Sequence, residues 1–174
     1  MAKVVWIVNY YTATPEKVSN PRYLQMAHYF MKGGYKVITF NHTFKGEKIF
    51  QRRQYGEYDF VHVKSPCYVG NGLKRMYSIW KFAQTLNNHC KEFEKPDIVL
   101  QNIHPPFDYP IVKMTKRLEA KYIAEAWDLW PDNFAVYGLM SRNNPIMKVA
   151  YQIEKYYYYA ADEIVFTFKG AFDY

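Results

Sequence analysis

The most unusual stretch of the sequence is Glu125-Ala126-Trp127-Asp128-Leu129-Trp130-Pro131-Asp132, in which two tryptophans bracket an acid. It follows a short apolar run, so the carboxylate of Asp128 is expected at a strand end, where it could orient or deprotonate a hydroxyl group. The faces of Trp127 and Trp130 can stack on sugar rings. A purely structural interpretation is equally consistent: the tryptophans anchor a loop, and Asp128 or Asp132 caps a short helix.

A second candidate is Ser19-Asn20-Pro21-Arg22, because its polar groups and guanidinium stand where a helix is predicted to begin. Free backbone N–H groups and the helix dipole make such a terminus receptive to a phosphate or a sugar hydroxyl. We therefore predict substrate contacts by Ser19, Asn20 and Arg22. Capping of the helix by Asn20, with Arg22 in solvent, explains the same residues without a ligand.

A third candidate is His104, in the loop Asn102-Ile103-His104-Pro105-Pro106-Phe107 that follows a buried strand. Two prolines stiffen this loop, and an imidazole held there could accept a proton or bind a hydroxyl group. We treat His104 as a catalytic candidate beside Asp128. An ordinary loop histidine is about as consistent with the pattern.

Several well-known motifs are missing from the sequence. There is no Gly-x-Gly-x-x-Gly, no Gly-x-x-x-x-Gly-Lys-Ser/Thr and no Gly-x-Ser-x-Gly, which argues against dinucleotide dehydrogenases, phosphate-loop nucleotidases and typical hydrolases. The five histidines lack metal-ligand spacing, and the two cysteines, Cys67 and Cys90, are expected to be free thiols. We predict neither a metal site nor a cofactor.

The elements that position these loops follow from the alternation of short apolar runs with helical patterns. Runs apolar on both faces predict buried parallel strands, at 4–8, 35–40, 60–63, 98–100, 122–124 and 163–166. Residues 42–58 are basic and poorly periodic, and we expect no regular structure there. Strands alternating with helices form right-handed βαβ units. The predicted fold is therefore α/β, a three-layer Rossmann-like domain with a mostly parallel sheet whose ligands bind at the carboxyl ends of the strands.

The predicted helices are recognised by apolar residues at helical spacing. One helix begins at Asn20-Pro21 and ends at Gly33-Gly34, and another spans about 107–118. A long helix after Gly72 has its inner face at Ile79, Phe82, Ala83, Leu86, Cys90 and Phe93. The last helix starts at Asn144-Pro145, and we expect its inner face to comprise Ile146, Val149, Ala150, Ile153, Tyr157 and Ala160.

Length and composition are those of one folded domain. The 174 residues are 49% hydrophobic, and 23 basic against 16 acidic side chains give a net charge of +7. No apolar run reaches the roughly 18–20 residues of a membrane span and no leader opens the chain, so we expect a soluble, cytoplasmic protein. The basic charge is compatible with nucleic acid, but no recognised motif supports that partner.

Aromatic residues make up 20% of the chain, and some of them accompany basic residues. The long helix after Gly72 carries Lys74, Arg75 and Lys81 beside Tyr77 and Trp80, outside its apolar stripe. This composition suits peripheral contact with an anionic bilayer surface, and it suits a solvated helix as well.

A set of motifs spread over nearly the whole chain resembles the N-terminal domain of glycosyltransferase family 4. The resemblance is strongest to the bacterial branch that builds capsular and O-antigen polysaccharides and includes fucosamine transferases. The motifs are Asn9-Tyr10-Tyr11, Asn20-Pro21-Arg22-Tyr23, Gly34-Tyr35-Lys36-Val37, Gly70-Asn71-Gly72-Leu73-Lys74-Arg75, Lys95-Pro96-Asp97-Ile98-Val99, Asp128-Leu129-Trp130-Pro131-Asp132, Gly138-Leu139, Asn144-Pro145 and Ala161-Asp162-Glu163-Ile164-Val165.

The resemblance implies a GT-B architecture, in which two Rossmann-like domains face each other across a cleft. Residues 1–174 would be the N-terminal, acceptor-side half, and an absent C-terminal domain would bind the nucleotide-sugar donor. Transfer would retain the anomeric configuration without a metal ion, and the donor phosphate would help take the proton. Asp128 is then a cleft residue, with His104, Ser19 and Arg22 as further candidates, and Asn71 lies in the matched third-loop motif.

Two positions depart from the family pattern. The stretch Pro15-Glu16-Lys17-Val18-Ser19 has no glycine where the family often has two, and Trp127 stands where the branch often has arginine. We expect the N-terminal half of a retaining sugar transferase of surface-polysaccharide synthesis, inactive as this fragment, whose acceptor is a glycan or polyprenyl-linked glycan at the cytoplasmic membrane face. The alternative is a non-catalytic Rossmann-like module that binds a small anion or nucleotide.

Overall fold

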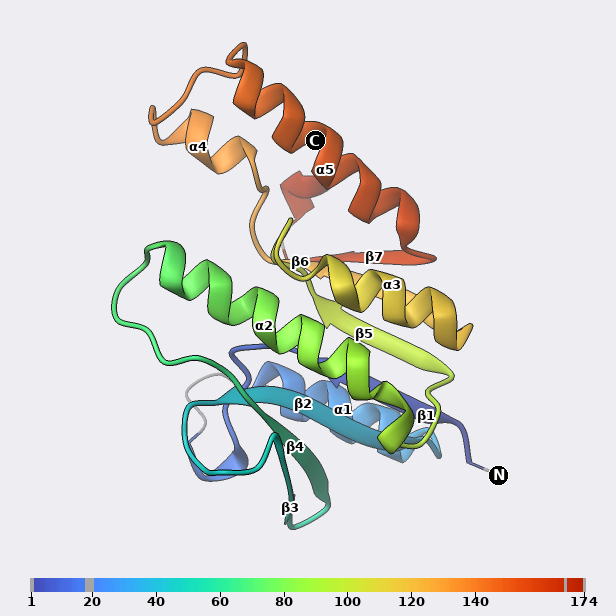
Figure 1. The fold of residues 1–174 in the computed structure, drawn as a ribbon. Helices are drawn as coiled ribbons and strands as arrows, with labels where there is room; N and C mark the ends of the chain where they lie inside the picture. The colour runs from blue at the N-terminus through green and yellow to red at the C-terminus, as the bar shows by residue number, and fades with distance from the viewer. Residues whose placement is uncertain (1, 18–20, 168, 174) are drawn as a thin grey trace.

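The computed structural model describes residues 2–17, 21–167 and 169–173, and their centre is one seven-stranded sheet (Figure 1). Its strand order is β3-β4-β2-β1-β5-β6-β7, and all neighbours are parallel except β3 and β4. The strands are β1 (Val4–Val8), β2 (Lys36–Thr43), β3 (Phe50–Tyr55), β4 (Tyr58–Lys64), β5 (Ile98–Asn102), β6 (Lys121–Ala126) and β7 (Glu163–Phe166).

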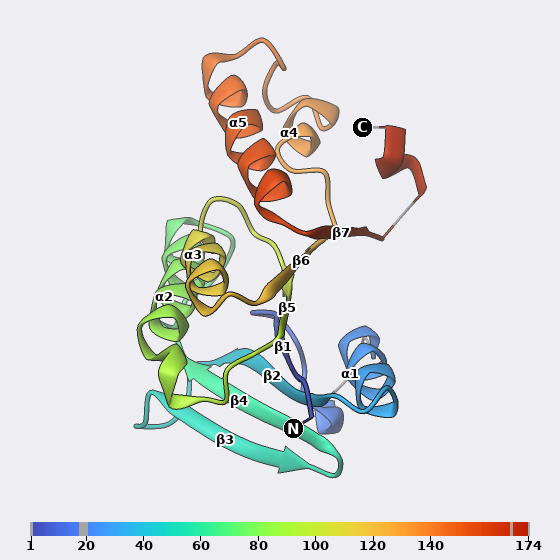
Figure 2. The same cartoon turned by 90° about the vertical axis from the view of Figure 1, so that its right-hand side faces the viewer.

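Helices cover both faces of this sheet (Figure 2). They are α1 (Arg22–Lys32), α2 (Leu73–His89), α3 (Tyr109–Leu118), α4 (Asp132–Val136) and α5 (Pro145–Ala160), with short 3-10 helices η1 (Pro15–Lys17), η2 (Cys90–Glu92) and η3 (Lys169–Asp173). Helices α2 and α3 pack on one face over a core that includes Trp6, Phe40 and Met114. Helix α1 packs on the other face through Tyr23 and Ala27. The predicted three-layer Rossmann-like domain with a mostly parallel sheet is therefore confirmed.

The long helix has the predicted inner face, since Ile79, Phe82, Ala83 and Leu86 are buried in the core. The helix ends at His89, earlier than the predicted stripe, and Cys90 in η2 and the partly buried Phe93 continue the same core beyond it. Both cysteines are free thiols, as expected. No helix among the described residues is both long and apolar enough to cross a membrane.

The expectation that residues 42–58 lack regular structure is wrong. This segment contains the end of β2 and the whole of β3, which pairs antiparallel with β4 through a tight turn at Gly56-Glu57. Gly56 has a φ of 59°, a conformation that hairpin turns require and glycine adopts without strain. Because β3 is an edge strand, its polar Gln51-Arg52-Arg53-Gln54 series is compatible with pairing on one side only.

The predicted inner face of α5 is confirmed at Tyr157, which is buried, and at Ile153 and Ala160, which pack against the same core, but it is wrong at Ile146 and Val149. Ile146 and Val149 are 66% and 60% exposed, whereas Met147 and Tyr157 are buried. The helix is apolar on more than one side, so its periodicity does not determine which side meets α3 and β6. Tyr157 packs against Val112, Tyr122 and neighbouring apolar residues, and this contact sets the rotation of α5.

Candidate active-site cleft

A cleft of about 560 Å³ opens at the carboxyl ends of β1, β5 and β6. Its walls come from the loops that follow these strands, from the N-terminal part of α2, and from α4 and α5. The predicted residues Asn71, His104, Trp127, Asp128 and Trp130 all line it. The structure therefore brings together residues that lie up to 59 positions apart in the chain.

Asp128 is exposed, and its carboxylate makes no side-chain hydrogen bond to the described residues. It also lines a second, more open depression beside Arg22, Gln25 and Thr167. Trp127 is 36% exposed, and its ring stacks on Tyr23 at a centroid distance of 6.0 Å. The cleft is thus lined by both tryptophans and by a carboxylate that has no side-chain hydrogen bond within residues 2–17, 21–167 and 169–173.

The capping alternative for this motif is not what the structure shows. Helix α4 begins at Asp132, its flanking residue is Pro131, and no side chain caps it. Asp132 is buried and instead accepts two hydrogen bonds of 2.8 Å from Arg142 and one of 2.6 Å from Tyr151. These bonds lower the pKa of Asp132, Arg142 being the largest cause. Asp132 therefore fastens α4 to the segment that follows it.

Arg75 contributes a positive charge to the opposite wall of the cleft. Its guanidinium donates to the hydroxyl of Tyr11 at 2.6 Å and to Asn71 Oδ1 at 2.7 Å. The sequence predicted Arg75 outside the apolar stripe of its helix, where it could face a bilayer or solvent, and the structure places it in the wall of the cleft. Asn71 therefore lines the cleft and also holds the guanidinium of Arg75 in place.

His104 lies in the cleft wall, with its side chain 22% exposed. Its Nδ1 is 3.7 Å from Asp108 Oδ2, and its backbone N–H donates to the same oxygen at 2.5 Å. The ring also contacts Tyr11 edge-on, at 5.3 Å between centroids. The contacts with Asp108 and Tyr11 restrict the orientation of the imidazole.

Asp108 is a residue that sequence reasoning missed. It is 3% exposed and accepts a 2.7 Å hydrogen bond from Gln101, whose own oxygen accepts from the hydroxyl of Tyr122. Burial, followed by the charge of Asp108, raises the pKa of both Tyr122 and Tyr157. The available signal was a polar Gln101 inside an apolar strand, which indicates a buried hydrogen-bond partner.

Glu125 is the second missed residue. It is fully buried at the end of β6, where Arg22 forms an ion pair with it at 2.5 Å and Tyr23 donates a hydrogen bond to it. Burial, and then the neighbouring Glu125, raise the pKa of the Tyr23 hydroxyl. An acid within the apolar run of residues 122–126 was the signal. Arg22, predicted to bind substrate, is thus at the edge of the site but already holds a carboxylate.

Ser19 and Asn20 lie outside the described residues, so these two predictions stay predictions. Helix α1 begins at Arg22, with Pro21 as the flanking residue. Within the described ranges, no group of three His, Cys, Asp or Glu side chains could hold a metal ion.

Known proteins resemble the chain in structure but not in sequence. No protein-family model matches it, and a comparison with curated proteins finds no match either. Sucrose-phosphate synthase from Thermosynechococcus elongatus superposes with a TM-score of 0.59 at 10% identity, over 93% of this chain and 41% of its own. An α,α-trehalose-phosphate synthase (UDP-forming) from Burkholderia vietnamiensis superposes with a TM-score of 0.55 at 10% identity, over 94% of this chain and 40% of its own.

A third solved structure, a trehalose-6-phosphate synthase studied for enzymatic glycosyl transfer with retention, gives a TM-score of 0.52 at 8% identity, over 92% of this chain and 38% of its own. The chain thus spans about two fifths of the length of these proteins. At such low identity the likeness concerns the fold alone: the chain has the Rossmann-like fold of one part of GT-B glycosyltransferases.

Proposed function

We propose that the chain is the acceptor-side, N-terminal domain of a glycosyltransferase of GT-B architecture. The observation that carries the proposal is that Asp128, whose carboxylate has no side-chain hydrogen bond to the part of the chain that the structure describes, lines a cleft together with Trp127 and Trp130 at the carboxyl ends of the parallel strands. Indole faces suit the apolar faces of a sugar ring, and a free carboxylate can accept a hydrogen bond from a sugar hydroxyl. The fold shared with sugar-phosphate synthases supports the same class of activity.

In this proposal the acceptor sugar lies in the cleft, and its reacting hydroxyl donates to Asp128. The donor, a nucleotide sugar, is held mainly by a second domain. The bond between the anomeric carbon and the leaving diphosphate breaks, and a bond from that carbon to the acceptor oxygen forms. The carboxylate of Asp128 orients the acceptor hydroxyl by accepting its hydrogen bond. As the new bond forms, the hydroxyl proton passes to the leaving phosphate, and Asp128 remains ionised at the end of the reaction. His104 and Arg75 contact the acceptor or the departing phosphate from the opposite wall.

The finer features of the proposal come from the resemblance described above. They are retention of anomeric configuration, independence from metal ions, a role in surface-polysaccharide synthesis, and a glycan or polyprenyl-linked acceptor. The fold likeness to enzymes that form UDP and to one that transfers with retention supports a UDP-sugar donor and retention as the first choices to test.

The test uses the complete protein that contains this chain. Transfer is measured as nucleoside diphosphate released from a panel of nucleotide sugars, with oligosaccharide and polyprenyl-linked acceptors and with EDTA present. We expect Asp128→Asn to lower turnover about 100-fold, because losing the group that orients the hydroxyl costs on that order. Glu47→Gln, an exposed acid far along the chain from the cleft residues, is the matched control.

Unchanged turnover in Asp128→Asn would show that the carboxylate is not part of the reaction. Binding of nucleotide or inorganic phosphate with no transfer to any acceptor would favour the alternative, a non-catalytic anion-binding module.

A further inference from the structure

Helices α2, α3 and α5 form one layer whose charge is almost entirely positive. They carry three, three and two basic residues, respectively, and the single acid among them, Glu154, is buried. Arg75 points into the cleft, and the other seven basic side chains are exposed: Lys74, Lys81, Lys113, Lys116, Arg117, Lys148 and Lys155.

None of these seven side chains forms an ion pair with the described residues. The basic residues of other elements are often paired, as in Lys36–Glu94 and Arg52–Asp59. Like charges gathered without counter-charges repel one another and destabilise a compact chain. Such an arrangement is favourable when an anionic partner compensates it.

Large apolar and aromatic side chains share this exposed surface. On α2, Leu73 is 82% exposed, and Tyr77 and Trp80 stack on each other at 5.9 Å. On α5, Tyr159 is 80% exposed and Lys155 lies over its ring. Ile146 and Val149 are exposed too, contrary to the sequence prediction, but the helical spacing puts them on a different side of α5 from Lys148 and Lys155. Aromatic and aliphatic residues interspersed with lysine are typical of helices that lie in the interface of an anionic bilayer.

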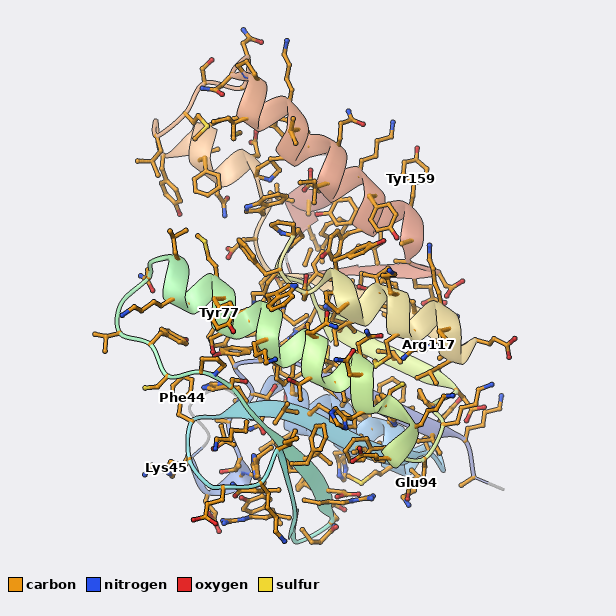
Figure 3. The ribbon with its side chains drawn as sticks, viewed as in Figure 1. Phe44, Lys45, Tyr77, Glu94, Arg117 and Tyr159 are labelled. Atoms are coloured by element: carbon orange, nitrogen blue, oxygen red, sulfur yellow. The ribbon has the colours of Figure 1, made fainter. Side chains whose placement is uncertain are left out.

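The three helices present one continuous surface. Arg117 of α3 donates to the backbone oxygen of Asn87 on α2 at 2.7 Å. The ring of Tyr109 on α3 contacts the ring of Tyr156 on α5, with a centroid distance of 5.6 Å, and the ammonium group of Lys116 lies over the ring of Tyr156. Figure 2 shows the helices on the same side of the sheet, and Figure 3 labels Tyr77, Arg117 and Tyr159, one on each helix.

We infer that this layer docks the protein on the anionic surface of a lipid bilayer. Six of its seven exposed cations are lysines, which act as point charges, rather than arginines that clasp phosphates in pairs. The exposed side chain of Leu73 contributes nothing to contacts with a nucleic-acid backbone, whereas a bilayer accepts it. The cleft borders α2 and α5, so docking would bring its rim alongside the lipid surface. The inference does not depend on the proposed transfer activity.

The test measures association of the complete protein with vesicles of phosphatidylglycerol and phosphatidylcholine in equal parts, and with vesicles of phosphatidylcholine alone. We expect binding to the anionic vesicles only. Replacing Lys81, Lys113 and Lys116 together by Glu should lower the association constant by more than about 100-fold, since each basic residue near such a surface contributes roughly fivefold.

The matched control reverses three exposed lysines outside the layer, Lys3, Lys17 and Lys32, and so changes the net charge equally. It should reduce binding far less. Equal losses in the two triple variants would reduce the effect to net charge and overturn the inference, as would equal binding of the layer variant and the wild type. Circular dichroism checks that both variants fold.

Two further measurements separate the outcomes. The tryptophan emission maximum should shift to shorter wavelength when the protein binds the anionic vesicles, and this shift should be lost in Trp80→Phe. Binding of duplex DNA or RNA through the same lysines, without vesicle binding, would overturn the bilayer assignment. Asp128→Asn should bind vesicles like the wild type, so failure of the proposed transfer reaction and failure of docking are distinguishable.

Discussion

Glu125 and Asp128 lie three residues apart at the carboxyl end of β6, and their surroundings are opposite. Glu125 is fully buried and is held by Arg22 and Tyr23. Asp128 is exposed in the cleft and has no side-chain hydrogen bond within the described chain. The first carboxylate has its hydrogen-bonding capacity committed to the fold, and the second has it available for a ligand.

The comparison shows how one short motif divides its acids between structure and chemistry. Asp132, four residues further, resembles Glu125, because Arg142 and Tyr151 hold it. The two committed acids fix the ends of the loop that carries Asp128 and the tryptophans. We infer that mutations in Glu125 and Asp132 act on stability, whereas those in Asp128 act on binding and turnover.

The largest expected effect on stability is that of Glu125→Ala, which removes the buried carboxylate that holds Arg22 and the Tyr23 hydroxyl and opens a cavity. We expect a loss of about 3 kcal/mol in the free energy of unfolding, measured by urea denaturation. Arg22→Met should also destabilise, because it removes the positive charge beside the buried Glu125 and leaves Tyr23 to hold this carboxylate. The double variant Arg22→Met/Glu125→Leu should recover part of the loss. A loss below about 1 kcal/mol in Glu125→Ala would remove the contrast with Asp128.

Asp132→Ala should cost about 1–2 kcal/mol, since it removes charge-assisted hydrogen bonds but from an arginine that is largely exposed. Urea denaturation measures the loss, and Tyr151→Phe, which removes only one of the bonds, should cost about half as much. If the two variants were equally destabilised, the Arg142 contact would be worth nothing measurable.

The stability of the protein should depend on pH through Asp132. Because the pKa of Asp132 is lowered in the folded state, its contribution is present above its unfolded value of about 3.9. The contribution is lost as the pH falls through the folded pKa. In Asp132→Asn the free energy of unfolding should therefore decline less steeply below about pH 4 than in the wild type, as urea denaturation at a series of pH values would show.

The smallest expected effect on stability belongs to Asp128→Asn, within about 0.5 kcal/mol of the wild type, because no folded-state partner is lost. The same variant should show the large loss of transfer described above. A strong destabilisation by Asp128→Asn would place its carboxylate with Glu125 and Asp132 and would sharply weaken its assignment to the site.

Much of the fold could be predicted from the sequence. Apolar runs predicted every parallel strand, and the stripe from Ile79 to Cys90 predicted the buried side of α2. Strand β3 was missed because an edge strand needs no apolar pattern, and its polar residues pair with β4 on one side only. The placement of Ile146 and Val149 on the inner face of α5 was wrong for another reason: several sides of that helix are apolar, and only packing against Tyr122 and Val112 selects one.

The sequence by itself determined which loops lie at the carboxyl edge of the sheet, and so brought Asp128, His104 and both tryptophans into one predicted site. Only the tertiary structure decided which acid is free. Glu125, Asp128 and Asp132 look alike along the chain, because their partners Arg22, Tyr23, Arg142 and Tyr151 belong to other elements. A carboxylate's role depends on its desolvation and on the cations near it, and both are properties of packing that a local pattern does not contain.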